Sequence, residues 1–255
     1  MKNQLSVSPP AVAVHDILTG SVTSVTPDAT AEEAIALMRR RNISCIIISE
    51  KKIPIGIFTE RNLVACAAQS IDFSKIRIDR VMSTPVISAP SSINIYEAFG
   101  IFSEKKIRHL VIVNKKGQTA GILTLSDLTS HLGVEYFVEV KKVNKIMSRS
   151  LVSVAADSTV QEAISIMLKR QLSCIFIKRN HMPVGILTER DVTRLIYEKQ
   201  SLDSITVDAV MSSPIRTIAS DASLHEASQL MKRHQCRRLG VTNREGILIG
   251  VITQS

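Results

Sequence analysis

Short apolar runs recur along the chain, each opened by a glycine and closed by a threonine. The four copies read GIFTERN at 56–62, GILTLSD at 121–127, GILTERD at 185–191 and GVIT at 250–253. Their glycines are spaced by 65, 64 and 65 residues. Each run has the length of a short strand, and a threonine followed three positions later by a polar residue is typical of a helix start. The pattern therefore predicts four copies of one structural unit.

The apolar spacing also predicts the order of elements within a unit. In the first unit, residues 22–25 are extended and Thr30 opens an amphipathic helix. Residues 43–48 form a continuous, largely β-branched run, which is typical of a strand buried on both faces. A second strand follows at 55–58, and Thr59 opens a second helix. Each unit should therefore run strand, helix, strand, strand, helix.

Capping boxes should open the first helix of every unit. In this motif a side chain at the first position and a glutamate three positions later satisfy each other's backbone N–H groups. The four expected pairs are Thr30–Glu33, Asn94–Glu97, Thr159–Glu162 and Ser223–Glu226. The remaining strands are expected at 110–113, 120–123, 174–177 and 184–187. Because all four caps fall at the repeat interval, each supports the others.

The units form two related pairs, which we call the first and second halves. ISCII at 43–47 resembles LSCIF at 172–176, and RHL at 108–110 matches RRL at 237–239, both at a shift of 129 residues. The predicted boundaries are 1–12 for a loose lead-in, 13–136 for the first half with units at about 13–70 and 78–136, and 140–255 for the second half with units at about 143–200 and 207–255. The fourth unit lacks its last helix, which should leave apolar surface uncovered.

The repeated strand and helix pattern, together with the VMSTP and VMSSP sequences that open the second and fourth units, resembles the CBS-domain family. The resemblance covers nearly the whole chain from about His15, in four in-register copies. It implies an α/β (α+β) fold of four βαββα repeats, paired through their sheets into two Bateman modules. It also implies adenosine-containing ligands in the clefts between paired repeats, and regulation of a partner enzyme, channel or domain.

Composition narrows the class of protein. With 45% hydrophobic and 22% charged residues, the chain is typical of a folded soluble protein. No apolar run reaches the roughly 20 residues that a membrane helix needs, and the start shows no signal-peptide core, which favours a cytoplasmic location without membrane contact. The four cysteines form no CxxC pair or His/Cys cluster, so no metal site is expected. The formal net charge of +9 favours an anionic partner.

The helix starts after the glycine runs are the main candidate ligand sites. Thr188 and Asp191 should cap their helix whether or not a ligand binds. In addition, a helix N-terminus that follows a strand offers free N–H groups and positive dipole charge to a phosphate. The threonine hydroxyl can donate to a phosphate oxygen, whereas the carboxylate suits a ribose diol. The resemblance implies the same division of roles.

The copies differ in which of these groups they keep. In the second unit Thr124 and Asp127 keep both groups, and Ser126 adds a hydroxyl. The first unit keeps Thr59 but has Asn62 in place of the aspartate, so it retains hydrogen-bonding capacity and loses the charge. The fourth unit stops two residues after its threonine, so no fourth site is expected.

Two basic pairs, 129 residues apart, lie where a loop enters the central strand: Arg108 with His109, and Arg237 with Arg238. Most arginines lie at the protein surface with the charge exposed to solvent, and these pairs could do the same. The resemblance instead implies that this position faces the ligand cleft. We therefore expect His109 and Arg238 to reach the helix starts of the first and third units. Arg108 and Arg237 should serve their own units. An arginine would bind a phosphate through two parallel hydrogen bonds, and His109 would bind a phosphate best when its ring is protonated.

Two functions fit these features. The first is a regulatory protein, not an enzyme, that senses AMP, ADP or ATP between paired units and signals to an unidentified effector protein, with no cofactor required. The second is a basic nucleic-acid-binding protein, which the presence of only three Tyr, six Phe and no Trp makes less favoured. The sequence contains no GxSxG, Walker or HExxH motif. The two halves could close into a disk within one chain, or two copies could form a homodimer.

Overall fold

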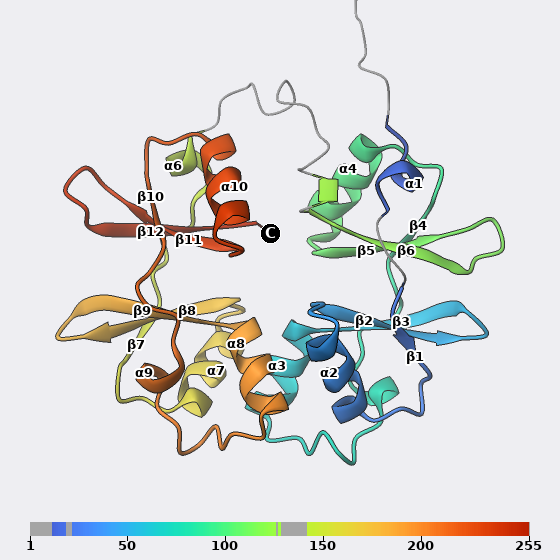
Figure 1. Cartoon of the computed structure of the whole chain (residues 1–255), viewed down its shortest axis with the longest axis horizontal. Coiled ribbons are helices and arrows are strands. Elements are labelled where there is room, and N and C mark those ends of the chain that lie inside the picture. The colour runs from blue at the N-terminus through green and yellow to red at the C-terminus, as the bar shows by residue number, and fades with distance from the viewer. Residues whose placement is uncertain (1–11, 19–21, 126, 129–141, 255) are drawn as a thin grey trace, which may run out of the picture.

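The computed structural model describes residues 12–18, 22–125, 127–128 and 142–254. It contains four small sheets, one in each unit. The sheets of the first and second units face each other in the right half of Figure 1, and those of the third and fourth units do so in the left half. Helices lie on the outer sides of the facing sheets. The predicted α/β fold of four units in two pairs is confirmed.

Every sheet has three strands in chain order, of which the first two are parallel and the last two antiparallel. The first unit holds β1 (Ser24–Val25), β2 (Cys45–Glu50) and β3 (Ile53–Thr59), and the second holds β4 (Ser88–Pro90), β5 (His109–Val113) and β6 (Thr119–Thr124). The third holds β7 (Ser153–Ala155), β8 (Cys174–Arg179) and β9 (Met182–Thr188), and the fourth holds β10 (Thr217–Ala219), β11 (Arg238–Thr242) and β12 (Leu248–Thr253). Most predicted strands are shorter than the observed ones by one to three residues, because the apolar runs mark the buried strand centres and not the polar hairpin ends. The expected strand at 22–25 is instead longer than β1, and the one at 43–48 is shifted by two residues from β2.

The helices begin where the capping boxes predict. The first helices of the units are α2 (Ala31–Arg40), α4 (Ile95–Lys105), α7 (Val160–Lys169) and α10 (Leu224–Arg233), and all four have both arms of the box. The closing helices α3 (Glu60–Ala68) and α8 (Glu189–Tyr197) are capped in the same way by Thr59 and Thr188. In the fourth unit the described residues end one position after β12, and no closing helix lies among them.

Short helical turns between the units pack on the neighbouring unit of the same half. These turns are α1 (Val14–Ile17), η1 (Ile78–Arg80), α6 (Val143–Ile146) and α9 (Val207–Val210). Val14, at the start of the first unit, lies in the core of the second, and Val143, at the start of the third unit, lies in the core of the fourth. Ile78 likewise lies in the core of the first unit. Each unit is therefore completed by a segment that precedes its partner in the sequence.

The glycines that define the repeat make room for these connecting segments. A Cβ atom on Gly56 would lie 2.1 Å from Sδ of Met82, and one on Gly185 would lie 2.2 Å from Sδ of Met211. These separations are far below a normal contact distance, so the methionine can cross the strand only where the strand has no side chain. The glycine period therefore records where a connecting segment lies across a sheet.

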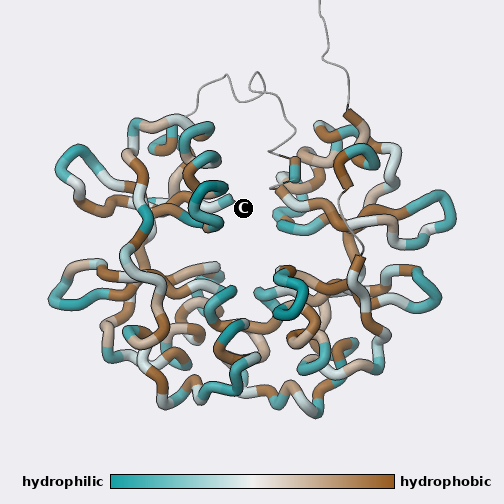
Figure 2. Tube along the Cα trace, viewed as in Figure 1, coloured by the Kyte–Doolittle hydropathy of each residue, from teal (hydrophilic) through white to brown (hydrophobic). Residues whose placement is uncertain are grey.

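One continuous hydrophobic core joins the two halves through the first and third units. In the lower part of Figure 1, α3 packs against α7 and α8, and α2 packs against α8. Ile35, Leu63, Ile164 and Leu195 are buried members of this core. Figure 2 shows hydrophobic positions along the strands, whereas the hairpin turns at the outer rim are hydrophilic. The burial of this apolar surface is the main force that holds the halves together.

An open cavity of about 1280 Å³ lies between the second and fourth units, in the upper part of Figure 1. Phe99 and Phe102 of α4 line it on one side, and Ala227 and Met231 of α10 line it on the other. In the lower part of the molecule α3 and α8 take the corresponding place. Apolar surface therefore lines the region beside the fourth unit, as expected for a unit without its closing helix.

Candidate functional site

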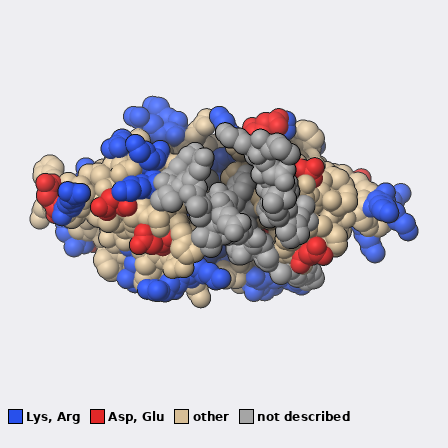
Figure 3. All heavy atoms as spheres, turned by 90° about the horizontal axis from the view of Figure 1, so that it is seen from above, with Lys and Arg blue, Asp and Glu red and all other residues tan. Residues whose placement is uncertain are grey.

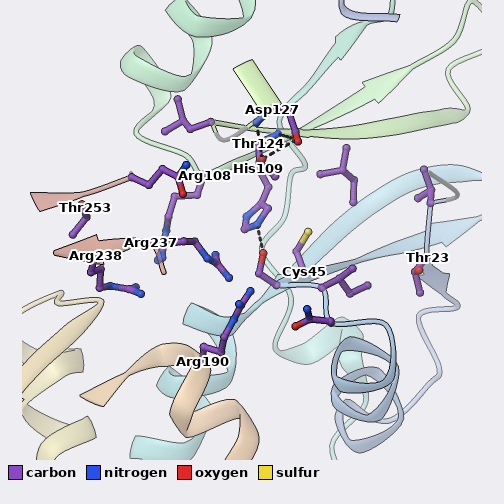
Figure 4. A pocket seen from close by; sticks show the side chains of 17 residues that line it. Thr23, Cys45, Arg108, His109, Thr124, Asp127, Arg190, Arg237, Arg238 and Thr253 are labelled. Atoms are coloured by element: carbon purple, nitrogen blue, oxygen red, sulfur yellow. Dashed lines mark hydrogen bonds between the residues drawn. The ribbon is translucent and has the colours of Figure 1, made fainter. Parts of the chain in front are cut away.

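A second cavity, of about 380 Å³, is lined by both units of the first half and by side chains of the second half. Residues 22–23 and 42–45 line it from the first unit. From the second unit come Thr124 and Asp127, at the end of β6. Figure 4 shows Arg190, Arg237 and Arg238 of the second half on the side of this cavity opposite Thr23. We call it the cleft cavity. It unites segments from all four units.

Thr124 and Asp127 form the polar end of the cleft cavity. The Thr124 N–H donates to Asp127 Oδ2 at 2.8 Å, and the Thr124 hydroxyl donates to the same oxygen at 2.7 Å. The Asp127 N–H donates back to Thr124 Oγ1 at 3.4 Å. The interaction that caps the helix start therefore also fixes a hydroxyl and a carboxylate in the cavity wall. Ser126, the third candidate of this unit, lies outside the described residues.

The first unit has a smaller cavity of about 190 Å³, which Thr59 lines and Asn62 does not. The Asn62 amide oxygen accepts from the Thr59 N–H at 3.0 Å. Its amide nitrogen donates to the Val81 carbonyl at 3.2 Å and to Ser83 Oγ at 3.0 Å. Asn62 therefore caps its helix and holds the connecting segment. This arrangement accounts for the amide, because a carboxylate could not donate these two bonds.

The third unit has both the threonine and the aspartate, Thr188 and Asp191, but they lie outside the three cavities. The Thr188 N–H and hydroxyl donate to Asp191 Oδ2 at 2.9 and 2.6 Å. Neither residue lines the cleft cavity, the smaller cavity or the open cavity. The structure therefore brings the second unit's pair into a cavity, although the third unit's pair matches the motif equally well.

Arg108 and Arg237 each contact a carboxylate of the opposite half, and the expectation that they serve the ligand sites of their own units stays a prediction. Arg108 donates from Nη1 and Nη2 to the two carboxylate oxygens of Glu189, at 2.7 and 3.0 Å. Arg237 approaches both carboxylate oxygens of Glu60 at 3.5 Å. Each arginine therefore contacts the closing helix of the other half. These pairs cross between the halves because packing of α3 against α8 brings both helix starts to the centre of the molecule.

His109 and Arg238 extend to the first and third units through equivalent serines, and their expected contact with a ligand at the helix starts stays a prediction. His109 Nε2 lies 2.8 Å from Ser44 Oγ, and Arg238 Nε donates to Ser173 Oγ at 3.2 Å. Burial, together with the charges of Arg108 and Arg237, lowers the pKa of His109 to about 3. The ring is therefore neutral near pH 7. The expectation that it acts as a cation does not hold for the ligand-free protein.

Glu60 and Glu189 are functional candidates that the sequence analysis missed. They are the first residues of α3 and α8 and are only 5% and 1% exposed. Arg190 Nε lies 3.4 Å from Glu60, and Arg61 Nε lies 3.6 Å from Glu189. The signal was the tripeptide TER, which occurs in both closing helices at a shift of 129 residues. Its glutamate reads as an ordinary first-turn acid, since carboxylates are favoured there.

The centre of the molecule carries an excess of positive charge. Five guanidinium groups, of Arg61, Arg108, Arg190, Arg237 and Arg238, surround the two carboxylates. Burial lowers the pKa of Arg237, and the charges of Arg190, Arg238 and Arg108 lower it further against the opposing effect of Glu60. An arginine stays protonated all the same. The three surplus charges make this region attractive to an anion.

The described parts of the chain contain no group of three or more His, Cys, Asp or Glu side chains that could hold a metal ion. Within those same parts, no helix is both long and apolar enough to cross a membrane.

Comparison with known protein families finds the same four repeated units in this chain. The family model described as CBS domain matches residues 14–68, 78–133, 140–198 and 207–255. An uncharacterised protein of Methanopyrus kandleri is 38% identical over 125 residues, which cover 48% of this chain and 61% of that protein. An uncharacterised protein of Methanocaldococcus jannaschii is 22% identical over 261 residues, which cover 94% of this chain and 60% of that protein. The chain therefore spans 60% to 61% of the length of these two relatives.

A solved structure shares the arrangement of all four units. The crystal structure of a Methanocaldococcus jannaschii protein, described as a proposed archaeal homolog of g-AMPK, matches with a TM-score of 0.83. The match covers 95% of this chain and 97% of that one, at 16% sequence identity. At this identity the likeness concerns the fold.

Proposed function

The chain belongs to the CBS domain family, and on that premise we propose that it is a regulatory protein that binds an adenine nucleotide between its first and second units. The observation that carries the proposal is the cleft cavity, where Thr124 and Asp127 lie beside arginines of the second half. Its volume of about 380 Å³ falls within the range of about 300–1,000 Å³ typical of small-molecule sites.

The lining of the cleft cavity divides into parts that suit the parts of a nucleotide. Ile43, Cys45 and Ile122 offer uncharged surface to a base, and burial, with the charge of Glu60, raises the pKa of the Cys45 thiol to about 12. The Asp127 carboxylate suits a ribose diol, which donates two hydroxyl protons. The arginines on the far side suit phosphate oxygens, which accept bidentate hydrogen bonds from guanidinium groups.

The second part of the proposal is that occupancy of the cleft cavity acts on an effector protein. A ligand shifts a conformational equilibrium only when it binds the two states with different affinity. Because residues from both halves line the cleft cavity, a bound nucleotide would favour one arrangement of the halves.

The substitution Asp127→Asn tests nucleotide binding while keeping the helix cap. Asn62 caps the equivalent helix of the first unit with its amide oxygen, so an asparagine at 127 should do the same. A hydrogen bond to a charged group contributes about 1.5–3 kcal/mol, so we expect the affinity for AMP, ADP or ATP to fall by about tenfold or more in isothermal titration calorimetry.

Asp191→Asn is the matched control, because Asp191 caps its helix identically but lies outside the cavities. The control should bind the nucleotide as the unchanged protein does. An equal loss of affinity in both variants would contradict the assignment to the cleft cavity. Absence of binding of all three nucleotides to the unchanged protein would contradict the proposed function itself.

Nucleic-acid binding, the alternative from the sequence, gains no support from a specific surface. Figure 3 shows that Lys and Arg side chains gather at several separate places on the visible face, not in one stripe that could follow a phosphate backbone. We therefore keep the nucleotide proposal alone.

A further inference from the structure

Glu60 and Glu189 each form ion pairs with arginines of the opposite half of the molecule. Glu60 of the first half contacts Arg190 and Arg237 of the second. Glu189 of the second half contacts Arg108 of the first in return, at 2.7 Å. The residues of these reciprocal contacts are related by the shift of 129 positions, so the two ion pairs are equivalent in the repeat.

The arginines that hold these carboxylates also line the cavities. Arg108, Arg190 and Arg237 are all part of the cleft cavity. Arg108 also lines the smaller cavity of the first unit, together with Glu60 and Glu189 themselves. A guanidinium group has a limited set of donors in one plane. An anion that enters the cleft cavity must therefore compete with a carboxylate for the same N–H groups.

The two ion pairs differ in strength, which shows where that competition is easiest. Arg108 makes a bidentate pair with Glu189 at 2.7 and 3.0 Å, whereas both contacts of Arg237 with Glu60 are 3.5 Å long. Arg237 also lies close to other arginines, and its side chain is 28% exposed. Of the two arginines, Arg237 is therefore the one more open to a new anionic partner.

We propose that Glu60 and Glu189 are built-in competitors of the ligand's phosphate groups, so that phosphate binding in the cleft cavity breaks the ion pairs that join the two halves. This inference rests on the proposed nucleotide function. A phosphate carries more charge than a carboxylate and accepts from guanidinium groups in the same bidentate geometry. When it takes Arg237, it leaves Glu60 buried beside a second anion, which is an unfavourable arrangement.

Through this competition, a ligand bound in the cleft cavity would change the packing at the interface between the halves. Glu60 and Glu189 are the first residues of α3 and α8, and these helices pack against each other. Loss of the ion pairs would change the preferred position of the two helix starts, and hence the relation of the halves. Adenosine, which lacks phosphate, would fill the cavity without this effect. The site would therefore respond to the phosphate groups rather than to the nucleoside.

The test compares adenosine, AMP, ADP and inorganic pyrophosphate on the full chain and on Glu60→Gln, by calorimetry and thermal denaturation. Removal of the competing charge should tighten binding of AMP and ADP by about fivefold or more, the lower end of common coupling effects, and leave adenosine unchanged. Glu50→Gln, an exposed carboxylate at the end of β2, is the matched control and should change neither.

The outcomes separate this inference from the proposed function. If adenosine and AMP bind but Glu60→Gln does not tighten AMP, the competition is refuted and the nucleotide site stands. If no adenosine compound binds but pyrophosphate raises the melting temperature more in Glu60→Gln than in the unchanged protein, the competition stands without the nucleoside. If neither occurs, both are refuted. Should Glu60→Gln fail to fold, Glu60→Asp keeps the charge on a shorter side chain and should tighten AMP binding to a smaller extent.

Discussion

Arg108 and Glu189 are 81 positions apart in the sequence and form a bidentate ion pair with distances of 2.7 and 3.0 Å. The side chain of Glu189 is 2% exposed and that of Arg108 is 20% exposed, so water screens the pair only weakly. Burial disfavours the charge on Arg108, but the hydrogen bonds and charge of Glu189 outweigh burial and raise its pKa. The pair therefore ties the second unit to the start of the third unit's closing helix.

Replacement of Arg108 by alanine should destabilise the whole protein. It leaves the buried Glu189 carboxylate with only the longer contacts to Arg61 and Arg238, both at 3.6 Å. Breaking a buried pair costs about 3–5 kcal/mol, and the two remaining arginines should place the loss near the lower end of that range. Urea denaturation measures the change in the free energy of unfolding.

The control for this prediction is Arg179→Ala. Arg179 pairs with Asp208 at the surface, where the two side chains are 55% and 37% exposed. Exposed pairs contribute only about 0–1 kcal/mol. A similar loss of stability in both variants would show that the central pair has no special role.

Acid should weaken the fold partly through His109. Its pKa is about 3 in the folded protein and near 6.5 in an unfolded chain, because burial and the nearby arginines disfavour the charged ring. Between these values the unfolded chain binds a proton that the folded chain does not, so stability falls as the pH drops from about 6.5 toward 3. His109→Gln should therefore lose less stability between pH 7 and pH 5, as measured by thermal denaturation.

An exposed histidine provides the comparison. His234, at the C-terminal end of α10, is exposed to solvent, and His234→Gln should keep the pH dependence of the unchanged protein. A pH dependence that is the same in the His109 and His234 variants would contradict the assignment.

Replacement of Gly56 by alanine should destabilise the first unit. The new Cβ would lie 2.1 Å from Sδ of Met82, so the methionine must move out of its position across the strand. Overpacking of this kind typically costs about 1–3 kcal/mol. Chemical denaturation of Gly56→Ala measures the loss.

Gly100 is a matched position with the opposite expectation. It lies within α4, and no atom is close to where its Cβ would be. Gly100→Ala should therefore stabilise the protein by about 0.5–1 kcal/mol, the difference between glycine and alanine inside a helix. If both variants behave alike, the contact with Met82 is not what requires the glycine at position 56.

Much of the fold could be predicted because its signals are local. The pair Thr159 and Glu162 is three residues apart, so the helix start is visible in the sequence without knowledge of the rest of the chain. The apolar runs predict the central strands for a similar reason. Register along each strand then follows from burial, since a one-residue slip would turn the apolar side chains to the other face.

The centre of the candidate site could not be predicted because its contacts are distant in the sequence. Arg237 and Glu60 are 177 positions apart, and nothing in either local sequence marks the other as a partner. The expectation that Arg237 serves its own unit considers only the contacts within the second half and leaves out its contacts with the first half. Packing of α3 against α8 determines the actual partner, and periodicity within one unit does not encode that contact.

The crossing of Met82 over Gly56 makes a pair of units, and not a single unit, the smallest self-contained piece of this chain. A single unit of about 65 residues, cut at its own boundaries, would lack the segment that covers its sheet, because that segment precedes its neighbour. A pair of units contains both segments and so closes on itself. The internal similarity agrees, since the sequence matches itself more closely at 129 residues than at 65.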